Sequence, residues 1–256
     1  MAASTPKRPP LTHFLCIPLV TPASRSQLSR SLAEFREDVT SENSFAVPPG
    51  AVRPLGTLHL TLGVMSLREE GKLEEATSLL RGLKLGEILD SVREAAKERM
   101  GKAVTAVGQT ASGEDRITIG EETLTISLKG LQTMHKPAQA KVLYAAPVDA
   151  RGLLYPFCER VRTAFVDAGL MVDEKRALLL HATVVNTIYA RRGGRGAAVR
   201  GKKPLTLDAR VLLDRYEDFM WMDNQVVEGV ALCKMGAKEV EGEDEQVYEE
   251  VARVGL

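Results

Sequence analysis

The sequence predicts an α+β fold built from two lobes that are related by approximate two-fold symmetry. The order strand, helix, strand occurs twice along the 256 residues. Each copy opens on an apolar strand that ends in proline, at Pro18 and at Pro147, and closes on a strand that carries a histidine with a threonine two positions later. A repeated unit that shares such details indicates an internal duplication, and hence two similar lobes.

Hydrophobic periodicity gives the elements of the first copy. Continuous apolar runs favour buried strands, alternation favours strands with one buried face, and apolar residues three and four apart favour helices. The pattern predicts a buried strand over 11–20, a helix through Leu28, Leu32, Phe35 and Val39 with Ser24 as its cap, an alternating strand over 58–67, and helices over 73–83 and 88–96.

The same reasoning gives the second copy and the domain limits. It predicts a hairpin over 117–131, a buried strand over 141–148, a helix from about Gly152 to Gly169 and an alternating strand over 178–190. We expect a flexible leader over 1–10, a single bilobal domain over 11–236, and an acidic surface tail or short terminal helix over 237–256.

Charge and cysteine content exclude several classes of protein. The chain has 34 Lys plus Arg against 34 Asp plus Glu, and a protein that grips a long nucleic acid through many phosphates normally has an excess of basic residues. Any phosphate-bearing ligand is therefore expected to be small. The three cysteines are widely spaced among apolar residues, which is typical of reduced core thiols in a nuclear or cytoplasmic protein. No apolar run approaches the length of a membrane span, so we expect no membrane partner.

The two repeated motifs carry the candidate chemistry. They are His59 with Thr61 and His181 with Thr183. Side chains two positions apart share one face of a strand, so each strand offers an imidazole and a hydroxyl on the same side. Two lobes related by a two-fold would bring the two pairs together across one cleft. The competing interpretation is that both are ordinary strand histidines that match by coincidence.

This pair of motifs suits cleavage of a phosphodiester. A neutral imidazole can take a proton from water or a ribose hydroxyl while a protonated one donates to the leaving oxygen, and the threonine hydroxyls can hold the non-bridging oxygens. We therefore predict His59 and His181 as catalytic and Thr61 and Thr183 as substrate-binding. The sequence has no HExxH, no paired CxxC and no carboxylate cluster beside either histidine, so it predicts no metal and no cofactor.

Around these motifs the chain resembles the two-histidine (2H) phosphoesterase superfamily. The segments LHLTLGVMSL, LKGLQTMHKPAQAKVLYA and LHATVVNT are similar to the branch that holds the nuclear-localisation-signal domain of an A-kinase anchoring protein and, more closely, the phosphodiesterase domain of a transcription cointegrator subunit. The resemblance implies a LigT-like fold with two lobes of mainly antiparallel sheet, outer helices and a central cleft. It also implies that His59, Thr61, His181 and Thr183 are the functional positions.

Two functions follow from the resemblance. The first is a monomeric, metal-independent phosphodiesterase in the nucleus or cytoplasm that acts on a nucleotide or short RNA: a 2′,3′-cyclic phosphate, or a 2′,5′-linked or 3′-terminal phosphodiester. The alternative is a non-catalytic sensor of AMP-like nucleotides, or an adaptor, in a nuclear multiprotein complex.

A basic, Gly-rich run over 191–203 follows the second motif strand directly. Its arginines, Arg191 and Arg192 first, are predicted to meet substrate phosphates, and the alternative is a solvated flexible loop. Tyr189 and Trp221 are candidate stacking platforms for a base, and the alternative is that both belong to the core.

Overall fold

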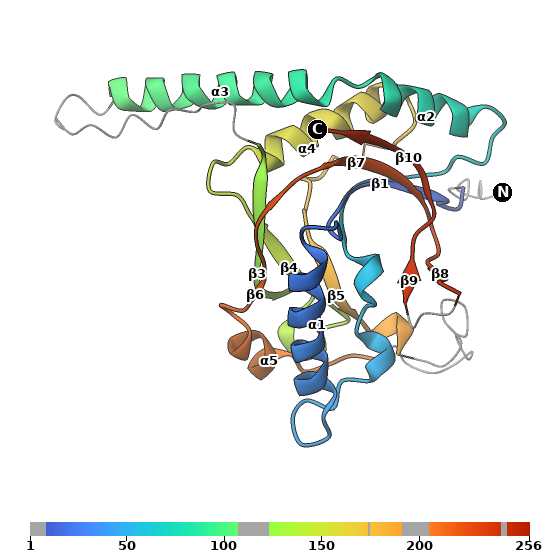
Figure 1. The fold of residues 1–256 in the computed structure, drawn as a ribbon, viewed down its shortest axis with the longest axis vertical. Helices are drawn as coiled ribbons and strands as arrows, with labels where there is room; N and C mark the ends of the chain where they lie inside the picture. Colours follow the sequence, from blue (N-terminus) through green and yellow to red (C-terminus); the bar gives the residue numbers. More distant parts are fainter. Residues whose placement is uncertain (1–8, 107–122, 174, 191–204, 242–244) are drawn as a thin grey trace, which may run out of the picture.

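The computed structural model describes residues 9–106, 123–173, 175–190, 205–241 and 245–256 (Figure 1). It contains two four-stranded antiparallel sheets, a two-stranded ribbon and five α-helices in these residues. The predicted α+β fold with two similar lobes is confirmed. Of the predicted leader, residues 1–8 lie outside the described part, and so do residues 117–122 of the predicted hairpin.

The first sheet holds the strands of the first copy and the C-terminal strands. Its strands stand in the order β10, β7, β1, β2, which are Glu250–Gly255, Gly229–Lys234, His13–Pro18 and His59–Met65. β1 pairs antiparallel with β2 on one side and with β7 on the other. Because β1 is central, its first five residues are buried, which explains the continuous apolar run seen in the sequence.

The second sheet repeats this plan. Its strands stand in the order β5, β4, β3, β6, which are Ala182–Asn186, Val142–Val148, Thr125–Thr133 and Met220–Val226. β4 matches β1 and β5 matches β2, since in each lobe a central strand is followed by a helix and then by the antiparallel edge strand that carries the motif. The internal duplication read from the sequence is therefore visible in the topology.

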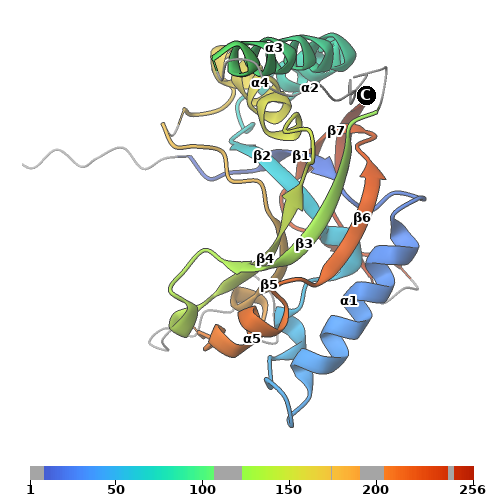
Figure 2. The same cartoon turned by 90° about the vertical axis from the view of Figure 1, so that its left-hand side faces the viewer.

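Two of the helices pack on the sheet of the opposite lobe rather than on the sheet that holds the preceding strand. The five helices are α1 (Arg25–Thr40), α2 (Lys72–Gly82), α3 (Leu85–Ala106), α4 (Leu154–Asp167) and α5 (Arg210–Arg215). α1 follows β1 but packs on β6 of the second sheet, whereas α4 follows β4 but contacts β2 of the first. Figure 2 shows α1 alongside β6, with α2, α3 and α4 gathered at the other end of the molecule. One continuous cluster of buried apolar side chains includes residues from both sheets. None of the helices in the described ranges is long and apolar enough to cross a membrane.

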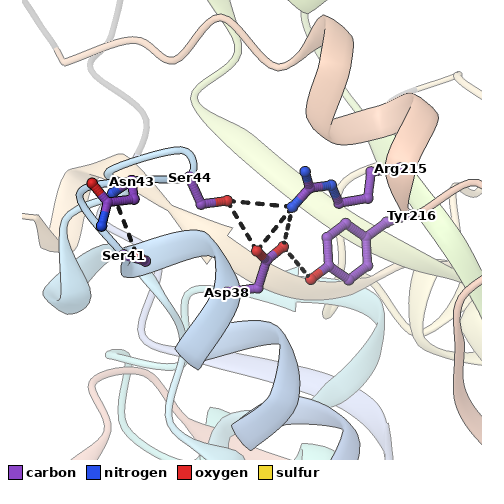
Figure 3. Close-up of polar contacts among 6 residues, drawn as sticks. All are labelled: Asp38, Ser41, Asn43, Ser44, Arg215 and Tyr216. Carbon is purple, nitrogen blue, oxygen red and sulfur yellow. Dashed lines mark hydrogen bonds and ion pairs between the residues drawn. The ribbon is translucent and has the colours of Figure 1, made fainter.

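A polar cluster joins the C-terminal end of α1 to α5 (Figure 3). The carboxylate of Asp38 accepts hydrogen bonds from Arg215 Nη1 at 2.9 Å, from the Tyr216 hydroxyl at 2.8 Å and from the Ser44 hydroxyl at 2.9 Å. These partners hold the pKa of Asp38 below its usual range. Because Tyr216 also packs edge-on against Phe35 of α1, the contact fixes α1 to the second lobe.

The structure differs from the sequence expectations at three places. The second motif strand covers only 182–186 of the predicted 178–190, so His181 directly precedes it. It ends at Asn186, because the Asn186 side chain accepts the N–H of Ile188 and residues 187–189 turn into a short 3₁₀ helix, η4. Ser24 does not cap α1 in the expected way: its hydroxyl donates to the carbonyl of Leu19 at 2.6 Å.

The third difference concerns the C-terminus. The expectation of a surface tail or short helix is wrong for residues 250–255, which form β10 and pair with β7. The glutamates at its start made this strand look like a solvated segment. Residues 238–239 and 246–247 form the small β8–β9 ribbon that precedes it.

Candidate functional site

The two motif strands meet where the lobes join. β2 and β5 are both edge strands, and they contact one another. The chain that leads into β2 strengthens this junction, because Val52 forms an antiparallel bridge with Val185 and the N–H of Arg53 donates to the Val184 carbonyl at 2.8 Å. The predicted convergence of the two motifs is thus supported by backbone contacts between the lobes.

The two histidines are anchored in the same way. His59 Nδ1 lies 2.8 Å from the carbonyl oxygen of Thr57, and His181 Nδ1 lies 2.8 Å from the carbonyl oxygen of Leu179. Since a carbonyl oxygen only accepts, each Nδ1 carries the proton. The lone pair of each neutral ring is therefore on Nε2, and that atom is left to accept or donate a proton in a reaction.

Thr61 shares a face of β2 with His59, and Thr183 of β5 follows two residues after His181, which directly precedes that strand. Thr61 lies opposite Cys16 of β1, and Thr183 lies opposite Tyr144 of β4. Both threonines are half-buried. Neither hydroxyl has a hydrogen-bond partner among the described residues, so both are available to donate to a ligand oxygen.

Aromatic side chains enclose the first histidine more tightly than the second. The His59 ring packs 4.7 Å from the Phe14 ring and 5.3 Å from the Tyr248 ring, centroid to centroid. His181 has one such neighbour, Tyr144, at 5.5 Å. Tyr248 belongs to the C-terminal segment that the sequence did not connect with the site.

Burial makes both imidazoles weak bases in the free protein. It lowers the pKa of His59 to about 4, and the nearby charges of His181 and Arg53 act in the same direction against the hydrogen bond to Thr57. Burial also lowers the pKa of His181. Both rings are therefore neutral near pH 7, and the expected pairing of one neutral with one protonated histidine requires an added anion, which raises the pKa of an imidazole beside it.

The pKa of His59 predicts a pH-dependent stability. Because the folded protein holds fewer protons than the unfolded chain below the ordinary pKa of 6.5, His59 lowers stability as the pH falls from 6.5 towards 4. We expect His59 to account for a loss of about 2 kcal/mol in unfolding free energy between pH 7 and pH 5. Urea unfolding at both pH values measures it. His59→Gln should remove that part of the loss and the exposed-site control His135→Gln should not; equal pH dependence in His59→Gln and the wild type would contradict the assignment.

The other residues considered as ligand contacts lie in different surroundings. The ring of Tyr189, in η4, is covered on one face by the guanidinium of Arg53, whose Cζ lies 3.9 Å from the ring centroid. Trp221 is only 1% exposed and packs in the core, which confirms the core interpretation of this residue over the stacking platform. Arg191 and Arg192 lie outside the described residues.

The second sheet also carries a depression away from the two motifs. Tyr144 lies beside Thr183, and its hydroxyl donates to Gln132 of β3 at 3.0 Å. Gln132 and Ala146 line a depression of about 640 Å³ bounded by α5. Alternation places Ala146 on the same face of β4 as Tyr144. The residues that line it come from β3, β4, α5 and positions 217–218, and none comes from β2 or β5.

Two similar lobes, each presenting an imidazole and a hydroxyl from an edge strand, define a protein of the two-histidine phosphoesterase class. Residues 11–256 match the family described as AKAP7 2′5′ RNA ligase-like domain, and the chain belongs to this family. The match extends through β10, in agreement with the place of that strand in the first sheet.

Two curated relatives are similar to parts of the chain. An uncharacterized protein of Schizosaccharomyces pombe is 32% identical over 144 residues, which are 56% of this chain and 63% of that protein. Activating signal cointegrator 1 complex subunit 1 of Mus musculus is 26% identical over 190 residues, which are 72% of this chain and 45% of that protein. The chain thus spans less than two thirds of either relative.

Two solved structures are similar to the chain at low sequence identity. A phosphoesterase is 18% identical with a TM-score of 0.49, and E. coli LigT complexed with 3′-AMP is 17% identical with a TM-score of 0.48. Each alignment covers 96% of this chain and 98% of the other.

Sequence reasoning missed four residues that surround the histidines. They are Phe14, Arg53, Tyr144 and Tyr248, which come from β1, the loop before β2, β4 and the segment between β9 and β10. Three are aromatic residues that read as ordinary core positions. Arg53 had a usable signal, because it is the one charged residue in the apolar Pro- and Gly-rich loop over 45–56.

Proposed function

We propose that the protein is a metal-independent phosphodiesterase that acts on a small RNA-derived phosphodiester. Its substrate class is a 2′,3′-cyclic phosphate, or a 2′,5′-linked or 3′-terminal diester. The observation that carries the proposal is the matched anchoring of His59 and His181 at the starts of two contacting edge strands, which leaves two Nε2 atoms free for proton transfer. Membership of a family described as 2′5′ RNA ligase-like supports the choice of an RNA-type diester.

The proposed mechanism begins with two neutral imidazoles. A bound phosphodiester monoanion raises the pKa of the histidine that faces the leaving oxygen, so that this histidine takes up a proton and later donates it. The other histidine accepts the proton of the attacking water or ribose hydroxyl through its Nε2. The hydroxyls of Thr61 and Thr183 donate to the non-bridging oxygens, where negative charge grows as phosphorus becomes five-coordinate. Because the two anchors are equivalent, the polarity of the substrate decides which histidine is the acid.

A substrate panel tests this proposal. Cyclic, 2′,5′-linked and 3′,5′-linked oligonucleotides are incubated with the protein, with and without a chelator, and products are separated by chromatography. We expect cleavage of at least one linkage at an unchanged rate in the chelator. Loss of all cleavage on chelation would show that a metal carries the reaction, and the acid–base assignment would then be wrong.

A second function is favoured by the low pKa values of both histidines. A site with no protonated imidazole near pH 7 is suited to hold a nucleotide without cleaving it. The similarity to a cointegrator subunit supports an adaptor role in a nuclear complex. Saturable binding of AMP by a monomeric protein, with no product after hours at high protein concentration, is the expected result for this function. Calorimetry with AMP, followed by chromatography of the same sample, distinguishes it from the enzyme.

A further inference from the structure

Arg53 is the buried cation of the site. Arg53 is 5% exposed, and its charge lies close enough to His59 to lower the pKa of that ring. It comes from the loop between α1 and β2, in the first lobe, yet its N–H is hydrogen-bonded to β5 of the second. Its position therefore links both motif strands.

The guanidinium of Arg53 has no anionic partner in the part of the chain that the structure describes. The guanidinium packs on the ring of Tyr189, whose centroid lies 3.9 Å from Cζ. By contrast, Arg215 and Arg210 each pair with an aspartate. A buried guanidinium without a carboxylate is unfavourable, because it loses hydration without gaining charge-assisted hydrogen bonds.

The nitrogens of this guanidinium are not sealed in the core. No nitrogen of Arg53 is among the fully enclosed polar side-chain atoms that lack a partner in the described residues. The unpaired donors of Arg53 therefore keep contact with open space. An arginine presents several N–H groups in a planar fork, which matches two oxygens of a phosphate.

We propose that Arg53 binds the phosphate group of the ligand, donating to its non-bridging oxygens, and that Tyr189 is a positioning residue that holds the guanidinium in place. The proposal rests on the proposed function, since it takes the ligand of the two-histidine site to be a phosphate ester. It gives the site a fixed positive charge that the two neutral histidines do not supply. It also gives Tyr189 a role different from stacking on a base.

The proposal explains how a bound ligand favours protonation of His59. With the site empty, the charge of Arg53 opposes protonation of His59. The negative charge of a bound phosphate offsets the positive charge of Arg53 and so favours a protonated imidazole. Arg53 thus couples ligand binding to the proton that cleavage requires.

The test measures affinity for inorganic phosphate and for adenosine 3′-monophosphate by calorimetry. Arg53→Met keeps the length of the side chain and the backbone bond to Val184 but removes the charge. We expect about 10- to 100-fold weaker binding, the effect of losing charged hydrogen bonds. The control Arg210→Met, which removes an exposed arginine paired with Asp208, should bind as the wild type does. An affinity in Arg53→Met within twofold of the wild type would overturn the proposal.

Two further measurements separate a binding role from a structural one. In an NMR titration, Arg53→Met should raise the pKa of His59. In the wild type, inorganic phosphate should shift the Arg53 Nε–H resonance, and this experiment does not depend on a variant that folds. An unmoved resonance at saturating phosphate would overturn the proposal, as would a wild type that binds no phosphate at all.

The position of Tyr189 is tested by a pair of variants. Tyr189→Leu removes the ring beneath the guanidinium and should weaken phosphate binding by about 3- to 10-fold, the range expected for a cation–π contact out of water. Tyr189→Phe keeps the ring and should restore the affinity. Equal affinities for Tyr189→Leu and Tyr189→Phe would remove Tyr189 from the proposal.

The proposed function and the role of Arg53 fail in distinguishable ways. A wild type that binds phosphate tightly through Arg53 but cleaves no linkage contradicts the phosphodiesterase and leaves Arg53 in place. A wild type that cleaves a diester, with a KM unchanged in Arg53→Met, contradicts Arg53 alone.

Discussion

Replacing either motif histidine with glutamine is expected to slow cleavage of the best linkage in the substrate panel by about 10²- to 10⁴-fold, the contribution of a positioned general acid or base. Glutamine has no group that titrates near neutral pH, so His59→Gln and His181→Gln each remove one proton-transfer step. The rate constant kcat measured in single turnover reports the change. The protein should remain folded, because each ring makes one hydrogen bond to a backbone carbonyl.

The combination of the two substitutions is informative. Since the acid and the base act in one step, the double variant should be little slower than either single variant. His135→Gln is the matched control, because His135 is exposed and lies outside the motifs. A loss of less than tenfold in either single variant would show that the histidine is not a catalytic residue.

The largest effect on stability is expected at Trp221. Its ring packs 4.8 Å from Phe35 of α1 and 4.8 Å from Phe219, and its Nε1 donates to the carbonyl of Gly130 at 2.8 Å. Trp221→Ala should lower the free energy of unfolding by about 3–5 kcal/mol, because it leaves a cavity where α1 meets the second sheet. Urea unfolding followed by circular dichroism gives this number.

A graded series identifies the source of the loss. Trp221→Phe keeps most of the packing but leaves the Gly130 carbonyl without its donor, so it should cost less than Trp221→Ala. Val211→Ala, at a residue that is 67% exposed, should stay within about 0.5 kcal/mol of the wild type. A Trp221→Ala protein as stable as Val211→Ala would show that this packing does not hold the lobes together.

The sequence was most informative where a local pattern reports a local environment. The central strands β1 and β4 could be placed because their apolar runs reflect consecutive buried residues, 13–17 in β1 and 143–145 in β4. The helix predicted from Gly152 to Gly169 appears as α4, since its apolar residues recur at helical spacing. The His-x-Thr pairs were found because alternation in a strand guarantees that the two side chains share a face.

Prediction was poorer where an element depends on distant neighbours. β10 begins with glutamate and has modest hydrophobicity, and only its pairing with β7 makes it a strand. The end of β5 was missed because a single hydrogen bond, donated by the N–H of Ile188 to the side chain of Asn186, converts an extended pattern into a turn.

The sequence alone predicted the repeated strand, helix, strand order and the four side chains of the two motifs. The repeat shows as a periodic pattern of apolar residues, and the histidine and threonine of each motif lie only two residues apart. The tertiary structure alone decided what surrounds those side chains. Arg53, Tyr248 and Tyr144 approach the histidines from separate elements of the fold. Their approach depends on how edge strands, loops and the C-terminal strand pack together, and packing between distant segments leaves no periodic trace in a sequence.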